Sequence, residues 1–477
     1  MIAWILLAAV VAFLAVILVR TALVVPRDNP ETDSREFVFD KEAAVNSLAE
    51  LVKCRTVSRD DHALEDDAEF EKLIGKLPTL YPHVFETCEF RRFEDRGLLF
   101  TWKGTGNGKP AVLMAHYDVV PIEEDKWTKP AFDALIEDGV MWGRGTLDTK
   151  GTFNGILFAA DTLISQGFRP ENDIYFAFSG GEEVNGQGAV HIVDYFAANG
   201  IEPELVLDEG GAVVSGVSPG VKEPCGLIGI AEKGLLNLEY SINSAGGHAS
   251  APAPHTPVGR LAAACTKVEN HPFPAHFTKP VLEMFDTLGR HSTFVYRMIF
   301  ANLWCFKGIL NLICKKSGGE MNALVRTTVA FTQMKGSKAP NVIPPSASMV
   351  SNLRLNPEDT VDSAVAYIRN VIGDEEIVLT KGQNMAPSPI SRTDCAGWQR
   401  VASAVATTWK GCLVAPYLMV QCSDSRHYGK ISDRVYRFSA MDLTAEERHS
   451  IHGNDEHIRL ETIHRAVEFF ARVMMQC

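Results

Sequence analysis

The chain alternates between segments with the apolar spacing of helices and short apolar runs typical of strands. Helical spacing is found in Lys41–Val52, Ala68–Leu77, Thr152–Gln166, Gly188–Asn199 and Leu460–Met475. Runs typical of buried strands are found in Leu98–Trp102, Ala111–Ala115, Asp173–Ser179 and Leu205–Leu207. Strands that alternate with helices of roughly 10–15 residues predict an α/β domain built on a mostly parallel sheet.

The pattern changes between residues 230 and 356. Leu235–Ile242 and Leu324–Gln333 alternate apolar and polar residues, as half-buried strands do, and Pro257–Asn270 has helical spacing between them. We therefore predict a separate α+β domain over residues 230–356, inserted into the first domain. The first domain would then consist of residues 41–229 and 357–477.

One stretch of the inserted segment is unusually apolar. Thr293–Leu312 is rich in aromatic residues but is interrupted by Arg297 and Lys307 and followed by two further lysines. This pattern favours a buried pair of helices. A membrane-facing patch and an apolar substrate channel are the two alternatives.

The N-terminus has the composition of a transmembrane helix. Residues 1–19 carry no charged side chain, and an apolar run continues after Arg20 to residue 25. About 20 apolar residues span a bilayer as a helix, and no basic segment or small-residue cleavage site marks a signal peptide. We predict a single-pass anchor over residues 1–25 and a polar linker over residues 26–40, with secretion after signal cleavage as the alternative. Arg20 and Arg27 favour a cytoplasmic enzyme body, but the acidic residues that follow leave the side of the membrane undecided.

The composition is that of an ordinary globular protein with more than one domain. The chain has 477 residues, of which 46% are hydrophobic and 22% charged. Its net charge of −13 argues against a nucleic-acid partner, which would require a basic surface. The ten cysteines form no C-x-x-C pair or zinc-finger spacing, so they leave the redox compartment undecided.

The candidate chemistry lies in five clusters, each of which follows a short apolar run. They are His116-x-Asp118, Asp148, Glu182-Glu183, Asp208 and His452. In open α/β sheets the working groups gather beyond the carboxyl ends of the strands, and three of the clusters directly follow predicted strands. A hydrolase with two metal ions about 3.5–4 Å apart needs a bridging carboxylate, terminal imidazole and carboxylate ligands, and a base. The set of clusters predicts such a site, although each residue alone resembles an ordinary loop residue.

The local spacing indicates which of these groups can bind metal and which can act in support or transfer a proton. His116 and Asp118 point to the same side of an extended segment, so Asp118 can orient an imidazole that binds metal. Asp148 lies in the glycine-bracketed loop GRGTLDTKG, where its carboxylate can bridge two cations. Glu182 and Glu183 point to opposite sides of their loop, so one can bind metal while the other transfers a proton.

These motifs resemble those of the M20 family of metallopeptidases, and within it the carboxypeptidase S-like branch, which includes secreted N-acyl amino acid hydrolases. The resemblance covers residues 40–477. Its most specific parts are MAHYDVVP, WGRGTLDTKG, SGGEEVNGQGA, LDEGG, GGHAS, NVIP, SDSRHY and IHGNDE. It implies a zinc-binding catalytic domain and an inserted lid domain that forms a homodimer.

The resemblance also implies roles for individual residues. One Zn²⁺ would take His116 and Asp208, the other Glu183 and His452, and Asp148 would bridge them. Asp118 would support His116, and Glu182 would be the general base. Outside the metal site, His248 of GGHAS would stabilise the oxyanion in the partner's active site, Asn341 of NVIP would hold substrate, and Arg426 of SDSRHY would bind the substrate carboxylate. A surface ion pair with Asp424 is the alternative for Arg426.

We therefore predict a membrane-anchored, dimeric, zinc-dependent hydrolase that cleaves amide bonds in small substrates with a free carboxylate. Short peptides and N-acyl amino acids with lipophilic acyl groups are both compatible with this chemistry. A carboxylate-rich site also accepts Co²⁺ or Mn²⁺. A non-catalytic binding protein with the same fold and an amidase that needs no substrate carboxylate are the weaker alternatives.

Overall fold

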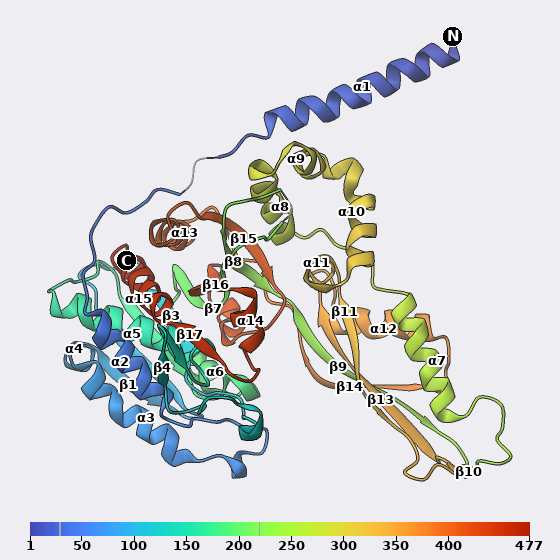
Figure 1. Cartoon of the computed structure of the whole chain (residues 1–477), viewed down its shortest axis with the longest axis horizontal. Coiled ribbons are helices and arrows are strands. Elements are labelled where there is room, and N and C mark those ends of the chain that lie inside the picture. The colour runs from blue at the N-terminus through green and yellow to red at the C-terminus, as the bar shows by residue number, and fades with distance from the viewer. Residues whose placement is uncertain (28–29, 219) are drawn as a thin grey trace.

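The computed structural model describes residues 1–27, 30–218 and 220–477. It consists of an N-terminal helix and two domains, which are called the catalytic domain and the lid domain after the predictions above, and the helix projects from the rest of the molecule (Figure 1). Asp28 and Asn29 of the predicted linker, and Pro219 of the predicted catalytic segment, lie outside the described residues.

The catalytic domain is built on an eight-stranded sheet with the order β1-β2-β6-β3-β7-β16-β8-β15. In chain order the strands are β1 (Glu89–Phe93), β2 (Gly97–Trp102), β3 (Ala111–His116), β6 (Ile174–Ser179), β7 (Leu205–Val214), β8 (Cys225–Glu232), β15 (Leu413–Met419) and β16 (Val435–Asp442). The central strands β6, β3, β7 and β16 run parallel, as does the pair β8–β15. However, four pairings are antiparallel: β1 with β2, β2 with β6, β8 with β7, and β8 with β16. The sheet is therefore mixed rather than mostly parallel.

Helices cover both faces of this sheet. One face carries α2 (Lys41–Val52), α3 (Asp67–Leu80), α4 (Pro82–Thr87), α5 (Lys150–Ser165), α13 (Ala396–Thr408) and α15 (Leu460–Met474). The other face carries α6 (Gly188–Ala198) and α8 (Lys279–His291). In β3, Leu113 faces the first set of helices, whereas Val112 and Met114 face α6. Burial on both faces explains why these strands are continuously apolar instead of alternating.

A three-stranded sheet connects two distant parts of the catalytic domain. It consists of β4 (Leu135–Glu137), β5 (Val140–Trp142) and β17 (His457–Arg459), in the order β17-β5-β4. The pairing of β17 with β5 brings the segment just before residue 457 beside the loop that starts at residue 143. The short helix α14 (Ala445–Ser450) leads into that C-terminal segment.

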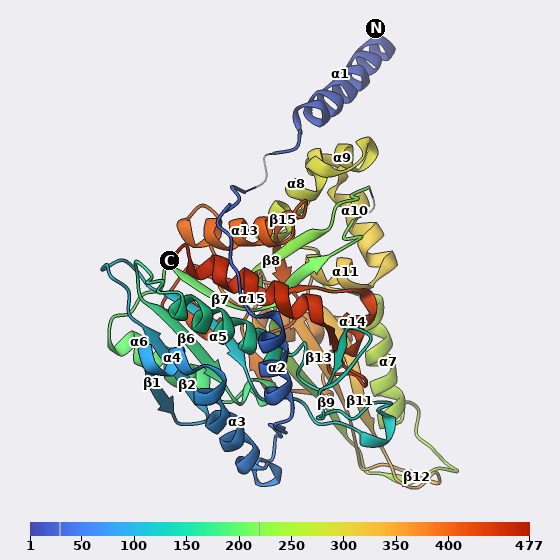
Figure 2. The ribbon, with the colours of Figure 1, turned by 60° about the vertical axis from the view of Figure 1, so that its left-hand side comes forward.

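The lid domain is an antiparallel four-stranded sheet with the order β11-β13-β9-β14. Its strands are β9 (Gly234–Asn243), β11 (Thr328–Lys335), β13 (Ser346–Leu355) and β14 (Val378–Met385). The helices α7 (Pro257–Asn270) and α12 (Val361–Ile372) pack on it. A small ribbon of β10 (Gly247–His248) and β12 (Val342–Ile343) forms the tip of the lid (Figures 1 and 2).

The structure corrects the predicted domain boundaries. The lid continues past residue 356, because β14 pairs with β9 and the apolar face of α12 (Ala364, Ile368, Ile372) packs into the lid core. The catalytic domain therefore resumes near residue 386 rather than 357. In addition, α8 and α11 (Gly319–Val325) contribute to a core shared with β8 and β15, so part of the predicted insertion belongs to the catalytic domain.

The N-terminal helix α1 (Ile2–Leu23) is long and apolar enough to cross a membrane. Its contacts with the body are made at α9 (Phe294–Ala301) and at the start of α10 (Leu303–Ser317). The described part of the following linker lies along the catalytic domain, where Phe37 and Phe39 pack against the core.

Candidate metal centre

The predicted cluster forms at one edge of the main sheet. His116 is the last residue of β3, and its parallel neighbours β6 and β7 reach the same edge. Two glycines follow β6, and Glu182 and Glu183 then lie in a single turn of 3₁₀ helix (Glu182–Val184). Since parallel strands present their carboxyl ends together, residues far apart in the sequence meet here.

Asp148 lies between two imidazoles. Its Oδ1 is 2.9 Å from His116 Nε2, and its Oδ2 is 3.0 Å from His452 Nε2. The second imidazole also lies 3.1 Å from Glu183 Oε2. One carboxylate that contacts both histidines through different oxygens has the arrangement required of a ligand shared by two metal ions.

Asp118 fixes the other side of His116. The Nδ1 atom of His116 lies 3.0 Å from the Asp118 carbonyl oxygen and 3.3 Å from its Oδ1. The Asp118 carboxylate also accepts hydrogen bonds of 3.2 Å from the backbone N–H groups of Glu182 and Glu183, and one of 2.6 Å from Ser58. Asp118 thus orients the imidazole and holds the glutamate turn against it.

The Asp148 loop is held by a residue to which the sequence analysis gave no role. Glu456 is fully buried and pairs with Arg144 at 2.7 Å. Its carboxylate also accepts hydrogen bonds from the backbone N–H groups of Leu147 (2.8 Å) and Asp148 (3.3 Å). The motif IHGNDE therefore supplies both His452 and the buried carboxylate that positions Asp148.

Beside the predicted ligand Asp208, the structure presents a second candidate carboxylate. Glu209, the next residue, lies 3.4 Å from His116 Nε2 through its Oε1 and groups with His116 and Glu182. The Asp208 carboxylate instead accepts a 2.9 Å hydrogen bond from the backbone N–H of Ser425. Neighbouring residues of a strand point to opposite sides, and in β7 the side that reaches His116 is that of Glu209.

The centre concentrates acidic groups that a cation would stabilise. Burial, and next the charge of Asp148, raise the pKa of Glu209 to about 8. Burial also raises the pKa of Glu182 and of Glu183. Hydrogen bonds to Asp148 and Glu183 raise the pKa of His452 to about 10.

The donor set fits divalent metal ions. The Oε1 atom of Glu183 is buried and has no hydrogen-bond partner among the described residues. Its other carboxylate oxygen faces His452. The ligand atoms of His116, Asp148 and Glu183 lie within 4.8 Å of one another, as do those of His116, Glu182 and Glu209. Imidazole and carboxylate ligands in this proportion suit Zn²⁺, Co²⁺ or Mn²⁺.

Arg426 lies beside the glutamate turn. Its Nη2 donates a 3.0 Å hydrogen bond to Oδ1 of Asn185, which directly follows that turn. Asp424 is buried and accepts a hydrogen bond from Ser179 at the end of β6. Arg426 therefore does not form the alternative surface ion pair with Asp424. It is hydrogen-bonded instead to Asn185, for which no role was predicted from the sequence.

His248 belongs to β10, and Asn341 directly precedes β12, with which β10 pairs. This ribbon forms the tip of the lid, well apart from the central strands of the main sheet (Figures 1 and 2). The backbone N–H of Ala249 donates a 3.0 Å hydrogen bond to the Asn341 carbonyl oxygen. Both residues are exposed. The backbone N–H of Ser250 donates to His248 Nδ1 at 3.1 Å, so the neutral imidazole carries its proton on Nε2.

Comparison with known proteins identifies the family. The model of peptidase family M20/M25/M40 matches residues 112–476. The chain belongs to this family. It is 34% identical over 446 residues to the probable carboxypeptidase S-like 2 of Dictyostelium discoideum, with 92% of this chain and 85% of that protein covered. It is also 34% identical over 482 residues to the N-fatty-acyl-amino acid synthase/hydrolase PM20D1 of Xenopus tropicalis, with 98% and 93% covered.

A solved structure gives the same fold. The M20 family metallo-carboxypeptidase Sso-CP2 from Sulfolobus solfataricus matches with a TM-score of 0.65 at 17% identity, over 91% of this chain and 98% of that one. The resemblance inferred from the motifs and the α/β metallopeptidase fold are thereby confirmed. The chain is therefore an M20-family metallohydrolase, similar to a carboxypeptidase S-like protein and to an N-fatty-acyl-amino acid synthase/hydrolase.

Proposed function

We propose that this M20 hydrolase uses two metal ions to cleave the amide bond of small substrates with a free carboxylate. The observation that carries the proposal is the Asp148 carboxylate, which contacts His116 through one oxygen and His452 through the other. Glu209 would complete the site of His116, and Glu183 that of His452. Two Zn²⁺ ions held there would lower the pKa of a bound water to about 7 and polarise the scissile carbonyl.

Glu182 is the proton carrier in this proposal. Its backbone is held by Asp118, while its side chain groups with His116 and Glu209. Burial raises the pKa of Glu182, so its carboxylate is a stronger base than an exposed glutamate. It takes a proton from the attacking water and gives it to the leaving amine.

Arg426 selects the substrate carboxylate. Its guanidinium is oriented by Asn185, immediately after the catalytic turn, and its Nε has no hydrogen-bond partner among the described residues. A guanidinium binds a carboxylate through two parallel hydrogen bonds. This support is geometric: the arginine is fixed to the same turn that carries Glu182.

The lid residues act across a dimer in this proposal. His248 is exposed at the tip of the lid and presents the N–H of its Nε2, which is the donor that an oxyanion needs. Asn341 lies beside it. Because the tip lies apart from the metal centre of its own chain, we infer that both residues serve the active site of a second copy.

Two substrate classes follow from the relatives, one named a carboxypeptidase and the other an N-fatty-acyl-amino acid synthase/hydrolase. Peptide and N-acyl substrates present the same amide and the same carboxylate, and differ only in the acyl group. We propose further that α1 anchors the enzyme in a membrane, with removal of α1 as a signal peptide as the alternative.

The test is amide hydrolysis by the full chain in detergent micelles, followed as release of phenylalanine from the free acids and of phenylalanine amide from the amidated substrates. N-acyl-phenylalanine with a short or a long acyl chain and a dipeptide with C-terminal phenylalanine would each be compared as free acid and as amide, with and without chelator. Chelator-sensitive cleavage of the free acids alone is the expected result, and the preferred acyl group identifies the substrate class. Arg426→Met should lose the preference for the acid, whereas Arg434→Met, which removes a similarly half-buried arginine paired with Glu204, should keep it. A dimeric, metal-loaded protein that cleaves none of these substrates would contradict the proposal.

A further inference from the structure

Helix α10 turns apolar side chains away from the protein. Leu310 and Cys314 are buried against the body, whereas Ile309, Leu312 and Ile313 are exposed. The exposed residues are spaced three and four apart and so share one face of the helix. A helix that only served the protein core would point this apolar face inward.

Helix α9 also exposes apolar side chains. The two helices are bent by 110° where they join, near Asn302. Together they carry an exposed apolar surface, called here the α9–α10 surface. It consists of Phe294, Val295, Trp304, Ile309, Leu312 and Ile313, each between 53% and 66% exposed. A soluble domain rarely exposes this many large apolar side chains on two consecutive helices without a binding partner.

The membrane helix packs directly on this region. Phe13 of α1 and Trp304 form an edge-to-face ring contact with centroids 5.6 Å apart. The fully buried side-chain amide of Asn302 donates to Oγ1 of Thr21 at 3.2 Å and to the carbonyl oxygen of Ile17 at 3.3 Å. In Figures 1 and 2, α9 lies at the end of the body from which α1 departs.

The contact with α1 sets the depth of the surface. Arg20 is the first charged residue after the apolar span, and its guanidinium donates to the Ala301 carbonyl oxygen at 3.3 Å. Phe13 precedes it by seven residues, which at about 1.5 Å per residue places Phe13 and its neighbour Trp304 about 10 Å further into the bilayer. Interfacial helices bury their apolar face by about 5–10 Å.

We propose that the α9–α10 surface is embedded in the interfacial layer of the bilayer that α1 crosses. The enzyme would then be held by two membrane contacts, so that the catalytic domain keeps one orientation instead of swinging on the linker. The inference relies on the anchoring proposed above only for placing α1 in the bilayer, and it requires nothing of the catalytic activity.

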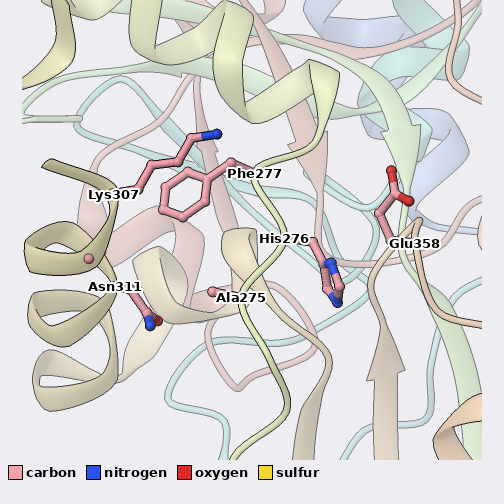
Figure 3. A pocket seen from close by; sticks show the side chains of 7 residues that line it. Ala275, His276, Phe277, Lys307, Asn311 and Glu358 are labelled. Carbon is pink, nitrogen blue, oxygen red and sulfur yellow. The ribbon is translucent and has the colours of Figure 1, made fainter. Parts of the chain in front are cut away.

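The flanks of α10 are polar, which supports an interfacial position. Lys315 and Lys316 are exposed at its end, where their ammonium groups can reach the headgroups. A pocket of about 440 Å³ on another side of the helix is lined by His276, Phe277, Lys307, Asn311 and Glu358, among others (Figure 3). With this lining it does not form the apolar substrate channel that was the other alternative for this stretch.

The test uses tryptophan quenching in the full chain, reconstituted into phosphatidylcholine vesicles whose acyl chains carry bromine near the glycerol end. The reference is Trp4→Phe, which removes the tryptophan of α1 and leaves six of the seven in the chain. If these emit equally, the brominated lipid should remove up to about one sixth of the emission, which is the share of Trp304. Adding Trp304→Phe should abolish this quenching.

A second variant tests the rest of the surface. Replacing Ile309, Leu312 and Ile313 by glutamate in the Trp4→Phe chain should move Trp304 outward and remove at least half of the quenching. Met334→Glu with Val378→Glu changes similarly exposed residues of the lid and should leave the quenching intact. Circular dichroism melts of all variants establish that they are folded.

Two outcomes would overturn the inference in distinguishable ways. In the first, the single variant Trp304→Phe, which keeps Trp4, is quenched, but Trp4→Phe is not. This result would show that α1 is inserted while the α9–α10 surface remains in water. Quenching in neither variant would also remove the anchoring by α1. Amide hydrolysis in detergent is measured independently and is affected by neither result.

Discussion

The candidate metal centre and the tip of the lid differ in whether one copy of the chain brings the functional side chains into contact with one another. At the candidate metal centre, side chains from distant segments meet one another, as the half-buried Asp148 meets the buried His116 and the more exposed His452. At the tip, His248 lies on the short β10–β12 ribbon and Asn341 directly precedes β12, and both residues are exposed to solvent. Among the described residues, only Ser250 forms hydrogen bonds with the His248 ring.

The difference reflects how each region is positioned. The sheet edge preorganises the metal ligands, because the strands that end there are fixed by burial on both faces. The lid tip has no core of its own, and its geometry becomes useful only when another surface meets it. We therefore expect one chain to hold metal alone but to need a second copy for full turnover.

The largest expected effect is at Glu182. Glu182→Gln should lower kcat by about 10³-fold or more, because it removes the proton carrier. Metal content, measured by mass spectrometry of the purified chain, should stay unchanged. Glu239→Gln, an exposed change in the lid, is the control. Loss of one metal ion per chain would instead make Glu182 a ligand, as its grouping with His116 and Glu209 also permits.

A second test compares the neighbouring acids of β7. Glu209→Gln should weaken binding of one metal ion by about 100-fold, because it removes a ligand carboxylate. Asp208→Asn should keep both ions, since its carboxamide oxygen can still accept the hydrogen bond from Ser425. Metal titration with a competing chelator measures both variants. The opposite ranking would restore Asp208 as the ligand.

This pair also shows where sequence reasoning was sufficient and where it failed. Apolar runs that end in acidic or histidine residues located the site, because strand ends of a parallel sheet converge. They did not determine which of two adjacent acids faces His116, since the register between β7 and β16 shifts between Asp208 and Gly211. The lid boundary failed for a different reason: β14 is largely exposed and polar, so it lacks the alternation that marks a strand.

The orientation of α9 and α10 could not be predicted either. An apolar helical face has the same spacing whether it meets a protein core or a lipid bilayer. Only the exposed side chains and the contacts with α1 distinguish the two.

The next prediction tests the division of work between the two regions. His248→Ala should lower kcat by about 100-fold without loss of metal, because it removes an oxyanion donor. When His248→Ala is co-expressed with Glu182→Gln, half of the dimers should contain one copy of each variant. In each such dimer one active site has both Glu182 and the partner's His248, so the preparation should show about a quarter of wild-type activity. Mixtures with no recovered activity would contradict the role in the second copy, and so would a fully active monomer.

The smallest effect concerns the junction between the catalytic sheet and the lid sheet. Lys233 lies between β8 of the catalytic sheet and β9 of the lid, is buried, and donates to the carbonyl oxygens of Ala323 and Arg326 at 2.9 and 2.8 Å. Burial, and next the charge of Arg354, lower the pKa of Lys233 to about 7. In the unfolded chain a lysine titrates near pH 10.4.

Between these two pKa values the unfolded chain binds more protons than the folded one. The free energy of unfolding should therefore rise with pH from about 7 to 10, by up to about 1.4 kcal/mol per pH unit from this group. Lys233→Met should lack this contribution, so its stability relative to wild type should fall as the pH rises across that range. Denaturant unfolding of both proteins at pH 7 and 9.5 measures the difference, with Lys109→Met, a surface lysine paired with Glu202, as the control. Parallel pH profiles for wild type and Lys233→Met would mean that Lys233 stays charged in the folded protein. Its carbonyl partners would then fully stabilise a buried charge at the junction between the lid and the catalytic domain.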